Sequence, residues 1–308
     1  MISRRGFLRA ASGIPWGMLG AAQAARGAGA DSGQPTFRVA TSAALLTGVN
    51  ENDARAAMRS WADVLSTMVG IHVDYEQYAF ASPSRLLELM RKGEVDAVGC
   101  TTPDYIPFAA FVDPNLVLVG INATGHEYLL LVNGKSGIHT VAELRGRPLA
   151  VYRHPATCLA MDWVEVLLSS LNLGPGERFF AGVTPNPKLS RTVLPVFFGQ
   201  SDVCLVTRSG FETMYELNPQ LGPGLRAVAS SERYITSLMG FHRDCDPAKK
   251  FKFQSALENL TKSATGKQLL AMFQSSGFSA RDTSVIRSAV DLVEAAGRVR
   301  RRYLGAKG

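Results

Sequence analysis

The sequence predicts an α/β protein with two lobes, each a mostly parallel sheet flanked by helices, and a ligand cleft between the lobes. Short apolar strand patterns alternate with amphipathic helix patterns in the first part of the chain, and a second such series follows from residue 128. The length of 308 residues is enough for two domains of about 100–150 residues. Because ligands bind beyond the carboxyl ends of strands in such sheets, polar loop residues there are the candidate site.

The first repeat has clear helix boundaries. Apolar residues recur every three or four positions after Asn52 and stop at Gly70, which predicts an amphipathic helix. Ser82 and Pro83 suit the cap and first position of a second helix, and Gly93 suits its end. The strands expected around these two helices are residues 37–41, 71–78, 95–99 and 116–121.

The second repeat follows from residue 128. Thr140 and Glu143 form a capping box, and Asp246 with Pro247 begins a helical remainder. The strands expected here are residues 128–132, 149–152, 179–183 and 202–206, followed by 227–229 and 237–241, which return the chain to the first half. We therefore assign residues 36–125 plus 226–303 to lobe one, 126–225 to lobe two and 304–308 to a basic tail.

The net charge of +7 is concentrated at the two ends of the chain. Residues 1–30 carry +4 and residues 298–308 carry +5, with no acid in either segment, which leaves residues 31–297 at −2. Nucleic-acid-binding domains carry a basic stripe or patch on the folded body. The nearly neutral body therefore argues against a nucleic-acid partner.

The N-terminus has the pattern of an export signal. Arg4-Arg5 and Phe7-Leu8 precede an apolar stretch over residues 14–25, and small residues offer cleavage after Ala24 or Ala30. The paired arginines favour the twin-arginine (Tat) route, and a basic membrane-surface helix is the alternative. We expect residues 1–30 to be a twin-arginine signal peptide, the Tat export machinery to be a partner, and the mature protein to be periplasmic.

Three segments together carry a resemblance to a known family. Residues 86–98 (LLELMRKGEVDAV), followed by Pro103 and Tyr105, resemble the helix–strand–loop of phosphate/phosphite/phosphonate-type substrate-binding proteins of ABC importers. Residues 141–151 (VAELRGRPLAV) are similar to the opening of that family's second lobe, and residues 276–282 to its closing segment.

The resemblance covers roughly residues 36–290 and implies a two-lobed type II periplasmic binding protein fold. It further implies that the lobes close on a small anionic ligand, phosphate- or phosphonate-like or another oxyanion, and deliver it to an ABC transporter permease. We expect a monomer with no cofactor. The alternative is a sensor that presents its bound form to a membrane kinase or receptor.

The resemblance also indicates ligand contacts. Tyr105 matches the aromatic hydroxyl of the family's first lobe, and Thr157 is the one hydroxyl kept where the family has Ser-Thr-Ser-Gly. Asn186 stands where the family has Ser-His, and Arg208 near the position of an acid that meets an amine. Anion capture needs hydroxyl, amide and arginine donors. The residues after the predicted strands that supply them are Thr41, Ser42, Thr101, Thr102, Tyr105, Arg153, Thr157, Asn186 and Arg208.

Other chemistry has weaker support in the sequence. Arg208 has the alternative of an ion pair with Glu212 at i+4. The five histidines have no metal-binding spacing, and no hydrolase or protease motif occurs, so we expect neither a metal nor an enzyme. An enzyme that uses Cys158 or Cys100 is the remaining catalytic hypothesis. The four cysteines allow three disulfide pairings, or remain as buried thiols.

Overall fold

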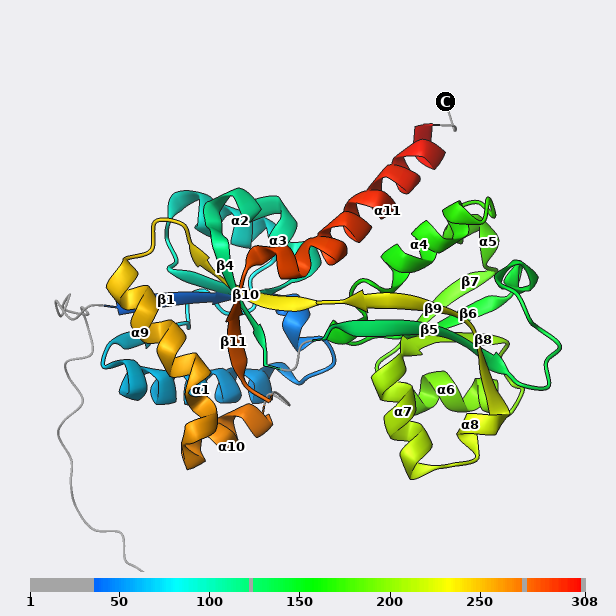
Figure 1. Ribbon diagram of the computed structural model, residues 1–308, viewed down its shortest axis with the longest axis horizontal. Coiled ribbons are helices and arrows are strands. Elements are labelled where there is room, and N and C mark those ends of the chain that lie inside the picture. The colour runs from blue at the N-terminus through cyan, green and yellow to red at the C-terminus, as the bar shows by residue number, and fades with distance from the viewer. Residues whose placement is uncertain (1–35, 122–123, 273–275, 306–308) are drawn as a thin grey trace, which may run out of the picture. The chain divides into compact units, whose positions relative to one another are not determined.

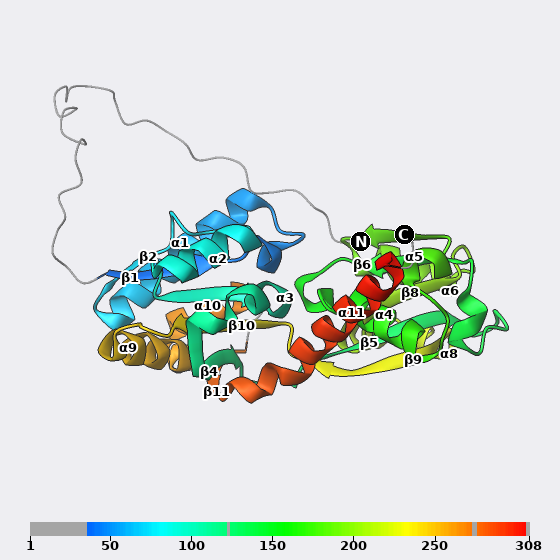
Figure 2. The same ribbon diagram turned by 90° about the horizontal axis from the view of Figure 1, so that it is seen from above.

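The computed structural model describes residues 36–121, 124–272 and 276–305. They form two sheets with helices packed on them, as Figure 1 and, from above, Figure 2 show. The six-stranded sheet has the order β11-β4-β10-β3-β1-β2 and the five-stranded sheet the order β7-β6-β8-β5-β9. We call the parts built on them the first and second lobes. The expected signal peptide lies outside the described residues, and none of the described helices has the length and apolarity needed to cross a membrane.

The amino-terminal half of the first lobe is a β-α-β-α-β unit. β1 (Thr36–Thr41) lies between β2 (His72–Asp74) and β3 (Ala97–Thr101) and is parallel to both. α1 (Glu51–Val69) and α2 (Pro83–Lys92) connect these strands, and both end at a glycine in the left-handed conformation, as the sequence predicts. β2 is shorter than the strand expected over the same region because a turn follows it directly.

The rest of the first sheet is antiparallel. The short helix α3 (Thr102–Tyr105) follows β3 and leads to β4 (Val112–Gly120). β10 (Ser237–His242) runs antiparallel to both β3 and β4, and β11 (Phe278–Arg281) runs antiparallel to β4. The expectation of a mostly parallel sheet is therefore wrong: the chain returns from the second lobe in the opposite direction, which makes the sheet mixed.

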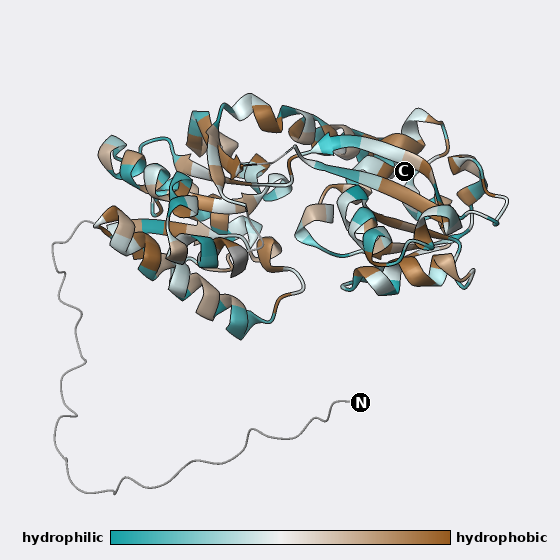
Figure 3. Cartoon of the chain, turned by 60° about the horizontal axis from the view of Figure 1, so that its bottom comes forward, coloured by the Kyte–Doolittle hydropathy of each residue, from teal (hydrophilic) through white to brown (hydrophobic). Residues whose placement is uncertain are grey.

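The first lobe has an apolar core on each face of its sheet. On one face lie α1, α9 (Pro247–Glu258) and α10 (Ala264–Met272), where the rings of Phe37 and Phe253 stack with centroids 4.1 Å apart. On the other face α2 contributes fully buried side chains such as Leu86. Figure 3 shows hydrophobic and hydrophilic residues alternating along the helices.

The second lobe is also built on a mixed sheet. β6 (Pro148–Tyr152) is parallel to β7 (Gly182–Asn186) and to β8 (Val203–Thr207). β5 (His126–Asn133) is antiparallel to β8 and to β9 (Leu225–Tyr234). The return to the first lobe was expected before this last strand. Its hydrogen bonds to β5 place it in the second sheet instead, so the chain returns only after β9.

The helices of the second lobe cover its sheet and connect its parallel strands. The strand expected at residues 179–183 begins at Gly182, because a helical turn precedes it. These helices are α4 (Ala160–Ser170), α5 (Gly176–Phe179), α6 (Leu189–Phe197), α7 (Arg208–Leu217) and α8 (Leu221–Gly224).

The last helix, α11 (Arg287–Gly305), joins the cores of both lobes. Ile286, just before it, is buried in the first-lobe core, whereas Ala289 and Leu292 are buried in the second-lobe core. The helix then packs along α4, as Figure 1 shows. The segment was expected in lobe one, and the structure packs it on both lobes: Val290 contacts the first-lobe core, whereas Ala289 and Leu292 complete the core of the second. Of the expected tail 304–308, the first two residues continue α11 and the others lie outside the described residues.

Candidate ligand-binding site

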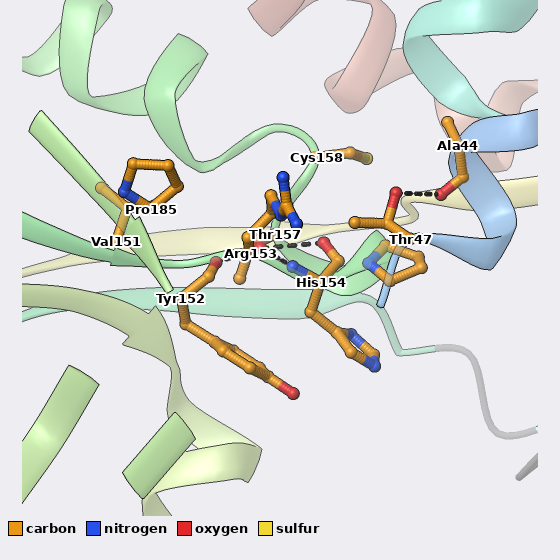
Figure 4. Close-up of a pocket in the computed structure, with 10 residues that line it drawn as sticks. Ala44, Thr47, Val151, Tyr152, Arg153, His154, Thr157, Cys158 and Pro185 are labelled. Atoms are coloured by element: carbon orange, nitrogen blue, oxygen red, sulfur yellow. Dashed lines mark hydrogen bonds between the residues drawn. The ribbon is translucent and has the colours of Figure 1, made fainter. Parts of the chain in front are cut away.

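A pocket of about 300 Å³ lies where the turn after β1 faces the loop after β6. Figure 4 shows the side chains that line it, which come from both lobes. Two of them, Arg153 and Thr157, are predicted site residues, and none of the described residues in the lining is acidic. The lining residues are Ala44, Thr47, Val151, Tyr152, Arg153, His154, Pro155, Thr157, Cys158 and Pro185.

The second-lobe side of the pocket is the edge where parallel strands end. Tyr152, the last residue of β6, pairs in register with Asn186, the last residue of β7. The backbone N–H of Arg153 donates to the Asn186 carbonyl oxygen at 2.8 Å. The structure therefore brings the backbones of Arg153 and Asn186 together, because parallel strands present their carboxyl ends at one edge of the sheet. Asn186 is not among the described residues that line the pocket.

Arg153 is the cation of this pocket. Its side chain is exposed, and its guanidinium forms no ion pair with any residue that the structure describes. A guanidinium presents several N–H donors in a rigid fork that matches the oxygens of an oxyanion. Arg153 can therefore supply both charge and hydrogen bonds to an anion that enters the pocket.

Thr157 uses its hydroxyl within the loop. The Thr157 Oγ1 lies 2.6 Å from the Tyr152 carbonyl oxygen and 2.8 Å from that of His154, and it accepts from the His154 N–H at 3.1 Å. A hydroxyl has one proton to donate. In this arrangement Thr157 fixes the shape of the loop that carries Arg153, and its hydroxyl proton is not directed to a ligand.

On the first-lobe side, two predicted residues, Ser42 and Thr102, are buried, and their hydroxyls form hydrogen bonds within the protein. The Ser42 Oγ donates to the carboxylate of Asp104 and accepts from the Ala44 N–H at 3.0 Å. The Thr102 Oγ1 donates to the carbonyl oxygen of Ile235, between β9 and β10, at 2.6 Å. Ser42 thus shapes the turn that reaches the pocket, and Thr102 anchors the segment that crosses between the lobes.

Three further predicted residues lie in the first lobe away from the pocket lining. The Thr41 Oγ1 accepts from the Phe80 N–H at 3.2 Å, and Thr101 is buried at the end of β3. Tyr105 packs edge-on against Phe108, and burial raises the pKa of its hydroxyl. The structure does not bring these three side chains together with Arg153.

Arg208 is held by an acid from a neighbouring strand. Its Nη2 donates to the Glu127 Oε1 at 2.6 Å, and this hydrogen bond lowers the pKa of the Glu127 carboxyl. The alternative partner at i+4, Glu212, forms no ion pair with it in the part of the chain that the structure describes. The charge of Arg208 is therefore balanced by Glu127.

Replacing Arg208 by alanine is expected to lower the free energy of unfolding at pH 7 by about 0.2–1 kcal/mol, since the ion pair is partly exposed. A carboxyl with a lowered folded-state pKa stabilises the protein above its ordinary pKa of about 4.3, and this contribution is lost as the pH falls through the folded value. The difference from wild type should therefore shrink at acidic pH.

Urea unfolding at pH 7 and at pH 3.5 measures this effect. Glu212→Ala is the control, with an expected change of about 0.5 kcal/mol or less at both pH values. The same deficit for Arg208→Ala at both pH values would contradict the assignment of Glu127 as its partner.

Eight of the ten described residues that line the pocket are not among the predicted site residues, and Tyr152 and His154 are two of these eight. Tyr152 and His154 stack with ring centroids 5.3 Å apart and an interplanar angle of 13°. His154 was counted among histidines without a metal-like spacing. Its position directly before Pro155, at the start of a turn, was a usable signal, because that is where a side chain caps a helix or turn.

Burial raises the pKa of all four cysteine thiols. All four are free thiols, and burial raises the pKa of Cys158 to about 12 and that of Cys100 well above its ordinary value. The Cys158 Sγ also donates to the carbonyl oxygen of Thr236 at 3.6 Å. Because the thiolate is the reactive form, neither residue is activated at neutral pH. Nor do the described residues contain a group of three His, Cys, Asp or Glu side chains that could hold a metal.

The two α/β lobes thus carry a pocket where their loops face each other. The family model described as "ABC transporter, phosphonate, periplasmic substrate-binding protein" matches residues 44–285. The chain therefore belongs to this family, as its resemblance indicated. Among curated proteins none matches the sequence.

Solved structures share this fold at low sequence identity. A Xanthomonas citri protein bound to a chloride ion has a TM-score of 0.64 at 16% identity, covering 87% of this chain and 99% of its own. A binding protein component of an ABC phosphonate transporter from Pseudomonas aeruginosa has 0.59 at 16% identity, covering 87% and 88%. PhnD1 from Prochlorococcus marinus, in complex with methylphosphonate, has 0.59 at 14% identity, covering 83% and 96%. They confirm the predicted two-lobed α/β fold class.

Proposed function

We propose that this protein captures a small oxyanion of the phosphonate or phosphate type in the pocket between its lobes and passes it to an ABC permease. One observation indicates that the ligand is an anion: the pocket contains Arg153, and among the described residues Arg153 has no ion-pair partner and no acid lines the pocket. An exposed guanidinium without a carboxylate partner favours an anionic ligand.

Family membership supports the transport role. Substrate-binding proteins of this family are periplasmic components of ABC transporters. The PhnD1 structure contains methylphosphonate, which makes this compound the natural first probe for the present pocket. The raised pKa values of Cys100 and Cys158 support a binding function without catalysis. We further propose export by the twin-arginine route, on the basis of Arg4-Arg5, and function as a monomer.

The test is a thermal-shift and calorimetric screen of the mature chain. The panel contains methylphosphonate, ethylphosphonate, phosphite, phosphate, an alkyl sulfonate and acetate, with potassium chloride at matched ionic strength as the control. A true ligand at 100 times its Kd should add about 2.7 kcal/mol of stability, and chloride should add nothing comparable.

Small-angle scattering of the same samples reports lobe closure. The radius of gyration should fall with the binding anion and stay constant with chloride. No stabilisation by any phosphorus oxyanion would contradict the proposed ligand class, and binding without compaction would contradict capture by closure.

A further inference from the structure

His154 has one ring nitrogen fixed by the backbone, and the other makes no hydrogen bond with the residues that the structure describes. Its Nδ1 accepts a hydrogen bond from the N–H of Ala156 at 3.1 Å, and its own backbone N–H donates to the Thr157 Oγ1. The residue thus forms a reciprocal capping box with Thr157 at the start of the turn Pro155–Thr157. The imidazole therefore caps the turn Pro155–Thr157, and Pro155 and Thr157 line the pocket.

This contact determines which tautomer is present. A nitrogen that accepts a hydrogen bond uses its lone pair and carries no proton, so the proton of the neutral ring is on Nε2. The Nε2 atom makes no hydrogen bond with a described residue, although His154 lines the pocket. Burial lowers the pKa of His154, which favours the neutral ring.

The ring is also held in orientation. It stacks on Tyr152, the last residue of β6, with the two planes 13° apart. Figure 4 shows both rings extending to the same side of the loop. A ring fixed by a cap on one edge and a stack on one face presents its remaining polar atom in a defined direction, which reduces the entropy lost on binding.

We propose that His154 is a further ligand-binding residue of the site, donating a hydrogen bond from a neutral Nε2–H to an oxygen of the bound anion. This inference rests on the proposed function, since it needs an anionic ligand in this pocket. It divides the recognition between two residues: Arg153 supplies the charge, and His154 supplies an uncharged donor that requires an acceptor oxygen.

Two near-isosteric variants separate the roles of the two ring nitrogens of His154. Asparagine keeps an acceptor at the position of Nδ1, so His154→Asn can still cap Ala156 but lacks the distal donor. Glutamine keeps an N–H donor at the position of Nε2, so His154→Gln retains the donor but loses the cap. His154→Ala removes both groups.

Binding of methylphosphonate, and of phosphite and phosphate as second probes, is measured by calorimetry on the full mature chain. Hydrogen bonds to charged groups contribute about 1.5–3 kcal/mol, so the Kd of His154→Asn and of His154→Ala should rise about tenfold or more. His154→Asn should unfold at a temperature close to that of wild type. His154→Gln should bind at least threefold more tightly than His154→Asn.

The outcomes distinguish this inference from the proposed function. If wild type binds none of the three probes, the proposed function fails and the inference fails with it. If wild type binds and His154→Asn binds within twofold of it, His154 is only a cap and the inference alone is wrong. Equal Kd values for the asparagine and glutamine variants would also overturn it.

Discussion

Replacing Arg153 by alanine is expected to weaken the binding of methylphosphonate by about 100-fold, because two charge-assisted hydrogen bonds of about 1.5 kcal/mol each are lost. Each 1.4 kcal/mol corresponds to a factor of ten in Kd. The guanidinium is exposed and forms no ion pair with a described residue, so its removal leaves no buried charge behind. The folded state should therefore keep its stability while affinity is lost.

Calorimetric titration of three variants tests this prediction. Arg153→Lys keeps the charge and removes the two-pronged donor geometry, so its Kd should fall between those of wild type and Arg153→Ala. Lys252→Ala makes the same change in net charge on an exposed position of α9 and should bind as wild type does. An Arg153→Ala variant with unchanged affinity would rule Arg153 out as the anion-binding group.

Replacing Phe253 by alanine is expected to lower the free energy of unfolding by about 3–5 kcal/mol. The side chain is fully buried between α9 and the first sheet. Besides stacking on Phe37, its ring meets Phe241 at 6.2 Å and Trp61 at 6.0 Å, both edge-on. The substitution removes the central ring of this group and leaves a cavity that its neighbours can fill only in part.

Chemical denaturation at pH 7 measures the decrease in the free energy of unfolding. Phe251→Ala is a matched control, because Phe251 lies two residues earlier on the same helix and is 69% exposed. Its expected effect is about 0.5 kcal/mol or less. A similar cost for the two variants would mean that the aromatic cluster does not hold α9 on the sheet.

Helix ends were predicted well because their chemistry is local. The Ser82 and Asp246 side chains cap α2 and α9 as expected, and Gly70 ends α1. Glu143 accepts from the Thr140 N–H at 2.8 Å, in the capping box that the sequence indicated. In each case the residues that decide the outcome lie within four positions of one another.

The positions of β9 and α11 could not be predicted in this way. An apolar stretch shows that a strand or helix will be buried, but it does not specify the surface that buries it. β9 has its partner β5 about a hundred residues earlier, and Ala289 packs into a core whose strands begin at His126. Such choices depend on the whole set of packing surfaces, which no short window of sequence contains.

The candidate site was predicted in part for a related reason. Its location at the strand ends follows from topology, and the backbones of Arg153 and Asn186 meet there. Which polar groups stay free depends on hydrogen-bond competition between residues far apart in sequence. The Arg208 guanidinium donates to Glu127, and the Thr102 hydroxyl donates to the carbonyl oxygen of Ile235. Both pairs are far apart in the sequence, so the sequence pattern does not reveal them.

The position of α11 has a consequence for synthesis of the chain. The second lobe's sheet is complete at Tyr234, yet its core also needs Ala289 and Leu292, and Asp162 on α4 needs its 2.5 Å ion pair with Arg300. A ribosome adds residues from the N-terminus, so this lobe stays unfinished until almost the whole chain has emerged. Neither lobe can therefore mature long before the other, and a chain truncated before α11 should leave the second-lobe core exposed to water.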